Sequence, residues 1–493
     1  MVKNASELQY TTQVKSLITA IYGKSNSTAP SIYAQAQEYF DNKASVQKQL
    51  QELKQQLVAL KGKKSAGLTT KDKKQLLHQI ALVEQQSSQL KKSLAEAQLT
   101  RYDFMKSIVD EIISLAEGET FEESHRKSAK LLGTIQLTIN TESKTVAEEH
   151  ERCKPLYKSV LCLRLLDQLL LEDNLKSQYV LSRLKGISKE LYLTFAECAP
   201  QKYQDYMEQV KSAVVTAALL QDIGNYHPDA QLLLFCEDGK ADPFRTLSLE
   251  ERKKLLQINH TETLHYVVAG IGMGKYIGDS KDEQALFNKM EKEKLEFINH
   301  MLKNWINPAE GIGNILKVPQ IYTSIVLSTK PNYDFKLIPQ VYQVLHQHAK
   351  KGFCNQEVVN SLEKITGMFP QGFGVTFIPK DSDGNDSDRF EYAIVSHLYP
   401  ADIKQPVCRT VTRNLTFIAR GVDVVVAEQN NLYFPETAKS LTKISKQRLD
   451  EILELLASNY HERKNMDMLP RCWHAKDYFS VARHQNLWNK AGS

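Results

Sequence analysis

The sequence predicts a mainly α-helical protein with an N-terminal antiparallel coiled-coil hairpin and a small C-terminal β appendage. Three observations support this class. Apolar residues recur in alternating steps of four and three between residues 46 and 98, which is the spacing of helices that pack side by side. Helical periodicity continues through the middle of the chain. Short runs rich in β-branched and aromatic residues are concentrated toward its C-terminal end.

Chain length predicts more than one structural unit. The 493 residues exceed what a single hydrophobic core usually serves, so about two to four domains are expected. A charged fraction of 25% and a hydrophobic fraction of 42% exclude a wholly disordered chain. The expected units are an N-terminal helical region at 1–150, a larger helical domain at 151–379, the β appendage at 386–430, and a C-terminal helix with a polar tail at 435–493.

The predicted hairpin at 46–98 is strongly basic. It contains ten lysines and four acidic residues, so its net charge of +6 exceeds the +5 of the whole chain. Glycines within 62–67 interrupt the helix, and Thr70 is expected to cap the second helix. The apolar positions of the heptad pattern are Val46, Leu50, Leu53, Leu57, Leu60, Leu76, Ile80, Val83, Leu90 and Leu94.

Two interpretations of this hairpin remain open. It is either an arm that binds a protein partner or dimerises, touching an anionic surface through Lys61, Lys63 and Lys64, or a solvated coiled-coil spacer with a lysine-rich outer face. The segment has no aromatic residue on which bases could stack, so no nucleic-acid binding is expected there.

The helical pattern after the hairpin has three expected breaks, at 117–120, 140–143 and 199–200. In the β-rich part, Arg420–Gly421 is expected to form a tight hairpin turn between the last two runs. A helix is expected at 441–460, followed by a tail that contains Trp473 and Trp488.

Membrane insertion and secretion are not expected. No apolar run approaches the roughly 18 residues that a membrane-spanning helix needs, and the first residues lack the apolar stretch of a secretory signal. The seven cysteines are scattered, with no C-x-x-C pair, which favours reduced thiols. These features predict a cytoplasmic protein.

The strongest local motif is AALLQDIGNYHP, at Ala217–Pro228. An apolar helix that ends in a carboxylate followed by Ile-Gly resembles the signature of the HD superfamily of metal-dependent phosphohydrolases, usually A-A-L-L-H-D-I-G-K. Those enzymes hold divalent metals with adjacent His and Asp side chains. Here Asp222 is retained, but Gln221 replaces the histidine and Asn225 replaces the lysine.

Flanking segments extend the resemblance to the HD-GYP subgroup, a bacterial family of cyclic di-GMP phosphodiesterases. Leu247–Glu251 leads to His260, Asn299–Trp305 resembles the family's H-H-E-R-W segment, and Ile321–Tyr333 follows in the expected order without an acidic residue. Gly367–Gly372 resembles the family's closing Tyr-Pro turn before β strands. The resemblance covers roughly 179–412 and implies a helical HD-like domain.

The resemblance carries three candidate metal ligands to this chain: Asp222, His260 and His300. The family's first-helix ligand is expected within 179–188, where neither His nor Glu occurs. The resemblance therefore implies either no cofactor or one divalent metal, iron or manganese. Each candidate also has a purely structural interpretation, as a helix-end or surface residue.

We expect a catalytically degenerate HD-GYP-like regulatory protein that binds a partner or a cyclic dinucleotide. The alternatives are a residual metal-dependent phosphohydrolase and a structural scaffold that dimerises through the coiled coil. Gly270–Lys275 lacks the spacing of a phosphate-binding loop and is expected to be a turn after a helix.

Overall fold

The structure is a computed structural model of the chain. It describes residues 2–23, 29–63, 69–140, 145–236, 239–305, 307, 311–381, 383–387, 389–414, 416–440, 447, 450–451, 454 and 470–489.

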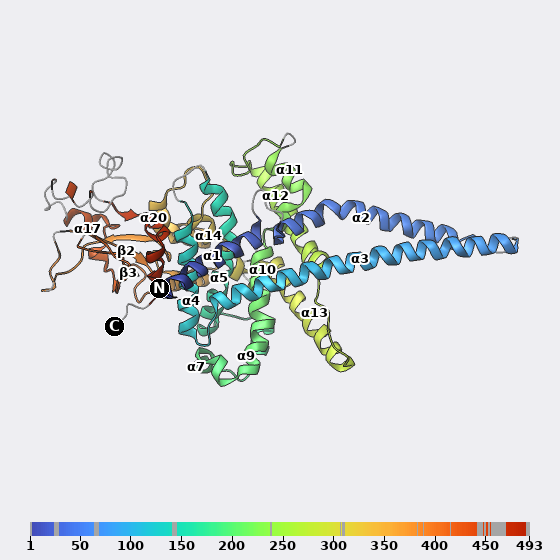
Figure 1. The fold of residues 1–493 in the computed structure, drawn as a ribbon, viewed down its shortest axis with the longest axis horizontal. Coiled ribbons are helices and arrows are strands. Elements are labelled where there is room, and N and C mark those ends of the chain that lie inside the picture. Colours follow the sequence, from blue (N-terminus) through green and yellow to red (C-terminus); the bar gives the residue numbers. More distant parts are fainter. Residues whose placement is uncertain are drawn as a thin grey trace.

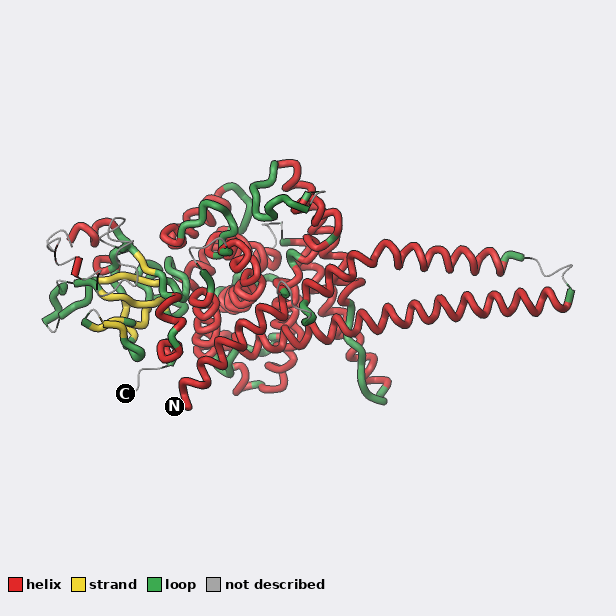
Figure 2. Tube along the Cα trace, turned by 45° about the horizontal axis from the view of Figure 1, so that its top comes forward, coloured by secondary structure: helices red, strands yellow, loops and turns green. Residues whose placement is uncertain are grey.

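The fold is mainly helical, with a small antiparallel sheet near the C-terminus, as the sequence predicts. A helical body lies between the sheet at one end and a long two-helix arm at the other (Figure 1). Figure 2 shows the strands confined to the end of the molecule opposite the arm. Within the described ranges, no helix is both long and apolar enough to cross a lipid bilayer.

Three N-terminal helices form the arm and its base: α1 (Val2–Tyr22), α2 (Ile32–Lys61) and α3 (Thr70–Ala116). The outer parts of α2 and α3 lie side by side and project from the body (Figures 1 and 2). The apolar residues of the predicted heptad pattern are all at least partly buried, and Val83 is only 8% exposed. The Thr69 hydroxyl caps α3 by accepting from Asp72 N at 3.2 Å, one residue before the expected cap.

The helical body contains the two breaks that the structure describes fully. Helix α3 ends before Glu117, and Pro200 begins a new helix after Cys198. The elements are α4 (Phe121–Thr138), α5 (Val146–Leu171), α6 (Gln178–Arg183), α7 (Lys189–Leu193), α8 (Phe195–Cys198), α9 (Pro200–Tyr206), the π-helix η1 (Met207–Lys211), α10 (Ser212–Leu220), the 3-10 helix η2 (Ile223–Tyr226), α11 (Pro228–Phe235), α12 (Leu249–His265), the π-helix η3 (Tyr266–Ile271), α13 (Lys281–Asn304), α14 (Gly311–Val326), the 3-10 helix η4 (Phe335–Gln340), α15 (Val341–Lys350) and α16 (Gln356–Thr366).

The main sheet has the strand order β6-β3-β2-β1-β7, and every pairing in it is antiparallel. The strands are β1 (Gly374–Phe377), β2 (Glu391–Val395), β3 (Val407–Thr410), β6 (Asp423–Val425) and β7 (Cys472–Trp473), and β4 (Thr412–Arg413) pairs separately with β5 (Thr416–Phe417). Short helices close the chain: η5 (Glu428–Asn430), α17 (Pro435–Ser440), α20 (Lys476–Ser480) and η7 (Ala482–Trp488).

The sheet differs from the sequence prediction in two respects. Strands β1 and β7 lie outside 386–430, because residues distant in sequence complete the sheet. Arg420–Gly421 joins β5 to β6, but these strands do not pair with each other; β6 pairs with β3, so the predicted tight hairpin turn is wrong. Most of the helix expected at 441–460 lies outside the described residues.

One hydrophobic core runs through the predicted units. It joins α1 and α3 to the buried apolar residues of α5 and α10, and it continues into the sheet through Val375, Ala393 and Val395. The boundary expected between residues 150 and 151 falls inside α5. The N-terminal region and the sheet are therefore packed onto the same core as the central helices.

A network of four buried charges lies within the helical body. Lys211 in η1 contacts Glu117 at 3.0 Å and Asp167 at 2.5 Å, while Arg164 in α5 contacts Asp167 at 2.9 Å and also pairs with Glu117. Burial alone would raise the pKa of Glu117, but the charges of Arg164 and then Lys211 outweigh it and lower this pKa to about 2. The network ties the end of α3 to α5 and η1.

His125 of α4 lies beside this network. Its ring stacks on Tyr399 with centroids 3.8 Å apart, and its Nε2 is buried without a hydrogen-bond partner among the described residues. Burial, followed by the positive charge of Arg164, lowers the pKa of His125 to about 3. The imidazole therefore stays neutral in the folded protein.

This low pKa predicts a loss of stability on acidification. Unfolded His125 binds a proton below about pH 6.5, whereas the folded residue does so only near pH 3, so the free energy of unfolding falls as pH falls between these values. His125→Phe keeps the ring but cannot titrate. Between pH 7.5 and 4.5 this variant should lose about 2 kcal/mol less stability than wild type in urea unfolding. His78→Gln, on the exposed arm, should behave as wild type; parallel pH curves for His125→Phe and wild type would contradict the assignment.

Candidate functional site

Asp222 follows the C-terminal end of α10 by two residues, where the sequence motif places it. Its Oδ2 contacts Lys158 Nζ of α5 at 3.0 Å, and its Oδ1 accepts from Gln320 Nε2 of α14 at 2.9 Å. Gln221 donates to the Oε1 of the same glutamine at 2.8 Å. The side chain of Lys158 is 4% exposed and that of Asp222 is 36% exposed. The carboxylate is thus held by two neighbouring helices.

The Ile-Gly pair after Asp222 has a packing role. A Cβ atom at Gly224 would lie 2.3 Å from Asn259 O, so only glycine lets η2 approach α12 this closely. Gly224 N donates to Thr263 Oγ1 at 3.1 Å, and Asn259 Nδ2 donates to Gln221 O at 3.2 Å. The Asp-Ile-Gly motif therefore positions α12 against the end of α10.

The two candidate histidines lie on other helices. His260 is half-buried on α12, and burial, followed by the charge of Lys303, lowers its pKa. His300 is exposed on α13, with Asn304 Nδ2 3.1 Å from its Nδ1. Across the described residues, no group of three or more His, Cys, Asp or Glu side chains is placed to hold a metal ion. The structure does not bring Asp222, His260 and His300 together as such a group.

The groups around Asp222 do not fit a divalent metal. The ammonium of Lys158 already neutralises the carboxylate and would repel a second cation, and Gln320 presents an N–H donor. The resemblance places a further metal ligand within 179–188, but the residue that contacts Asp222 is Lys158 of α5. Sequence reasoning missed Lys158, although a lysine inside an apolar helix is itself a signal of a buried ion pair.

A cavity of about 570 Å³ opens beside Asp222. Aromatic rings form part of its wall: Tyr33 lies 5.2 Å from Tyr22 and 4.9 Å from Tyr226, measured between ring centroids. Burial, then the charge of Glu151, raises the pKa of Tyr22 to about 12, so its hydroxyl stays protonated.

The cavity is also rich in cationic side chains. Its charged lining residues are Lys154, Arg245, Arg252, Lys330, Glu151 and Asp222. Lys154 pairs with Glu151 at 2.7 Å, and Arg245 pairs with Glu251 at 3.0 Å. Arg252 and Lys330 are exposed. The lining therefore carries an excess of positive charge beside the aromatic rings.

Two buried polar atoms in this wall lack partners within the described chain, Asn225 Oδ1 and Arg245 Nη1. Buried polar atoms are usually hydrogen-bonded in native proteins. One acceptor and one donor are therefore available to a molecule that enters the cavity.

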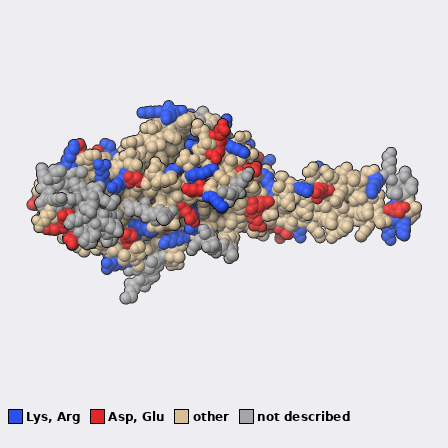
Figure 3. Space-filling view, turned by 90° about the horizontal axis from the view of Figure 1, so that it is seen from above, with Lys and Arg blue, Asp and Glu red and all other residues tan. Residues whose placement is uncertain are grey.

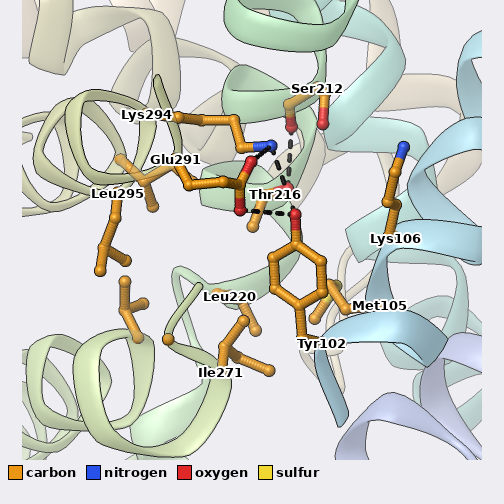
Figure 4. A pocket seen from close by; sticks show the side chains of 13 residues that line it. Tyr102, Met105, Lys106, Ser212, Thr216, Leu220, Ile271, Glu291, Lys294 and Leu295 are labelled. Carbon is orange, nitrogen blue, oxygen red and sulfur yellow. Dashed lines mark hydrogen bonds and ion pairs between the residues drawn. The ribbon is translucent and has the colours of Figure 1, made fainter. Parts of the chain in front are cut away.

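The glycine-rich segment Gly270–Lys275 serves the protein's own packing. Gly274 N donates to the carboxylate of Glu291 at 2.9 Å, and Tyr102 donates to the same Oε2 at 2.6 Å. Figure 4 shows Glu291 and Lys294 of α13 directed towards Tyr102 of α3. The cavity there measures about 30 Å³, which is room for about one water molecule. Gly270 and Ile271 are the last residues of η3, and residues 272–275 follow this helix without regular structure; the amide of Gly274 binds a carboxylate of the chain.

The lysines predicted to mediate interaction lie near the tip of the arm. Lys61 pairs with Glu84 of α3 at 2.7 Å, and Lys63 is exposed. Lys64 lies outside the described residues. Figure 3 shows basic side chains near this tip, while much of the shaft on the same face is uncharged. At least one of the predicted interaction lysines, Lys61, therefore forms an ion pair between α2 and α3.

Comparison of the chain with protein-family models, with curated proteins and with solved structures found no significant match.

Removal of the Asp222 carboxylate should destabilise the fold. Asp222→Ala leaves the buried Lys158 ammonium without its counter-charge, so the free energy of unfolding should fall by about 1–3 kcal/mol in urea titrations. Adding Lys158→Met to this variant removes the stranded charge and should recover part of the loss. Asp229→Ala, at a side chain 73% exposed, is the matched control and should change stability by less than about 0.5 kcal/mol. Equal stability of the Asp222 and Asp229 variants would contradict this role.

Proposed function

We propose that the protein is a catalytically inactive HD-like regulatory protein that binds a cyclic dinucleotide in the cavity beside Asp222. The observation that carries this proposal is the 3.0 Å ion pair between Lys158 Nζ and Asp222 Oδ2. Metal-assisted hydrolysis would need this carboxylate as a ligand for a divalent cation. Here the ammonium group of Lys158 neutralises the carboxylate of Asp222 in place of a metal ion, which favours ligand binding without hydrolysis.

The cavity lining supports a ligand with both phosphate groups and bases. Its volume of about 570 Å³ falls in the usual range for small-molecule sites. Arg252 and Lys330 are suited to phosphodiester oxygens. The rings of Tyr22 and Tyr226 offer apolar surface to a purine. The free acceptor Asn225 Oδ1 can receive a base N–H.

A second function is supported by the arm. Val58 and Leu77 are 65% and 66% exposed, and Leu82 is 48% exposed, so apolar side chains project into solvent from both helices. Exposed apolar residues on a projecting helical pair favour contact with a protein partner or a second copy of the chain. Sedimentation equilibrium of wild type and of Leu77→Lys tests this role.

Calorimetric titration with cyclic di-GMP should give a saturable heat for the wild-type protein. Arg252→Glu combined with Lys330→Glu places two negative charges on the cavity wall, so affinity should fall by at least about tenfold, through loss of charge-assisted hydrogen bonds. Lys253→Glu is the matched control: the residue is exposed and adjacent to Arg252 in α12, but it does not line the cavity. Its affinity should equal that of wild type.

Two outcomes would contradict the proposal. Absence of heat at high ligand concentration would remove the dinucleotide and leave the arm as the functional element. Stoichiometric iron or manganese in the purified protein, with hydrolysis of cyclic di-GMP abolished in Asp222→Asn, would instead identify a residual metal-dependent phosphohydrolase.

A further inference from the structure

Among the described strands, β6 lies at the edge of the sheet. Thr410 N donates to Val422 O and Val426 N donates to Pro406 O, both at 3.0 Å, so these residues direct their main-chain groups towards the β3 side. Main-chain groups alternate in direction along a strand, which turns the N–H and C=O of Val425 away from β3. Val422 is 56% exposed and Val425 is 63% exposed. Such an edge can pair with an added strand.

The position of β6 is firmly held. The carboxylate of Asp423 receives two hydrogen bonds from Arg409 of β3, at 2.7 and 3.1 Å. Arg409 is only 5% exposed and also donates to Asn489 O at 2.6 Å. An extended segment would therefore meet a preformed edge, which lowers the ordering cost of binding.

A groove of about 610 Å³ borders this edge and carries an excess of positive charge. Its charged lining residues are Lys380, Arg389, Arg413, Arg420 and Glu391. Lys380 pairs with Asp386 at 3.1 Å, and Arg389 pairs with Glu391 at 3.1 Å. Arg413 and Arg420 are exposed, and neither guanidinium forms an ion pair within the described part of the chain. Two guanidinium groups thus remain available in the groove.

We propose that this groove binds an extended acidic segment of a partner protein, which adds a strand to β6. Main-chain hydrogen bonds to Val425 would supply sequence-independent affinity, and Arg413 and Arg420 would select carboxylate side chains. The lining favours a peptide over single-stranded nucleic acid: among its described residues the one aromatic side chain, Phe377, is 8% exposed and offers no stacking platform. This surface lies on different elements from the cavity beside Asp222.

The test uses the full chain and a fluorescein-labelled eight-residue peptide of alternating threonine and glutamate. Fluorescence anisotropy should show saturable binding that weakens as salt is raised, because the contacts are ionic. Arg413→Glu combined with Arg420→Glu should weaken binding by at least about tenfold. Val425→Pro removes the outward N–H while leaving the β3 side of the strand intact, and should weaken binding by a similar factor.

Arg471→Glu is the matched control, because Arg471 is an exposed arginine next to the opposite edge strand β7 and should leave affinity unchanged. Thermal unfolding verifies that each variant is folded; if Val425→Pro does not fold, the arginine pair decides the test. Equal affinity for a threonine-lysine peptide, unchanged binding by the double arginine variant, or displacement of the peptide by a single-stranded oligonucleotide would overturn the proposal.

Discussion

The fold depends on compensating four charges inside its helical body. All four residues are buried, and each contacts both residues of opposite charge in the network, which consists of Glu117, Arg164, Asp167 and Lys211. Asp167 also accepts a hydrogen bond from Tyr192. A buried charge is expensive unless it is paired, so α3, α5 and η1 must keep one relative position. The network joins the end of the arm helix α3 to the central elements α5 and η1.

The same principle operates at Asp222. A carboxylate at the end of α10 resembles a remnant of a metal centre in the sequence, whereas in three dimensions it is half of an ion pair with Lys158. An ammonium provides the charge compensation that a divalent cation would provide, but it offers no coordination sites and activates no water. Lys158 therefore balances the charge of Asp222 without creating a site for a metal ion.

The helical class, the arm and the strands β2, β3 and β6 were predictable because each follows from local periodicity. Val83 and the other apolar heptad residues are spaced alternately three and four positions apart, which is the spacing of paired helices. Strands β2 and β3 lie in short runs of β-branched and aromatic residues. The pairing of β6 with β3 and the addition of β7 were not predictable, since they join segments distant in sequence. Lys158 and Asp222 are separated by 64 positions, so no local pattern reveals their contact. The cavity escaped prediction for the same reason.

Helix α3 has a mechanical consequence. Its 47 residues run without interruption from the tip of the arm to Ala116, directly before Glu117 of the charge network. At 1.5 Å per residue the helix is about 70 Å long. One continuous helix therefore connects the tip of the arm to the residue that precedes Glu117. A partner bound at the tip would contact the same helix whose other end adjoins the buried charges.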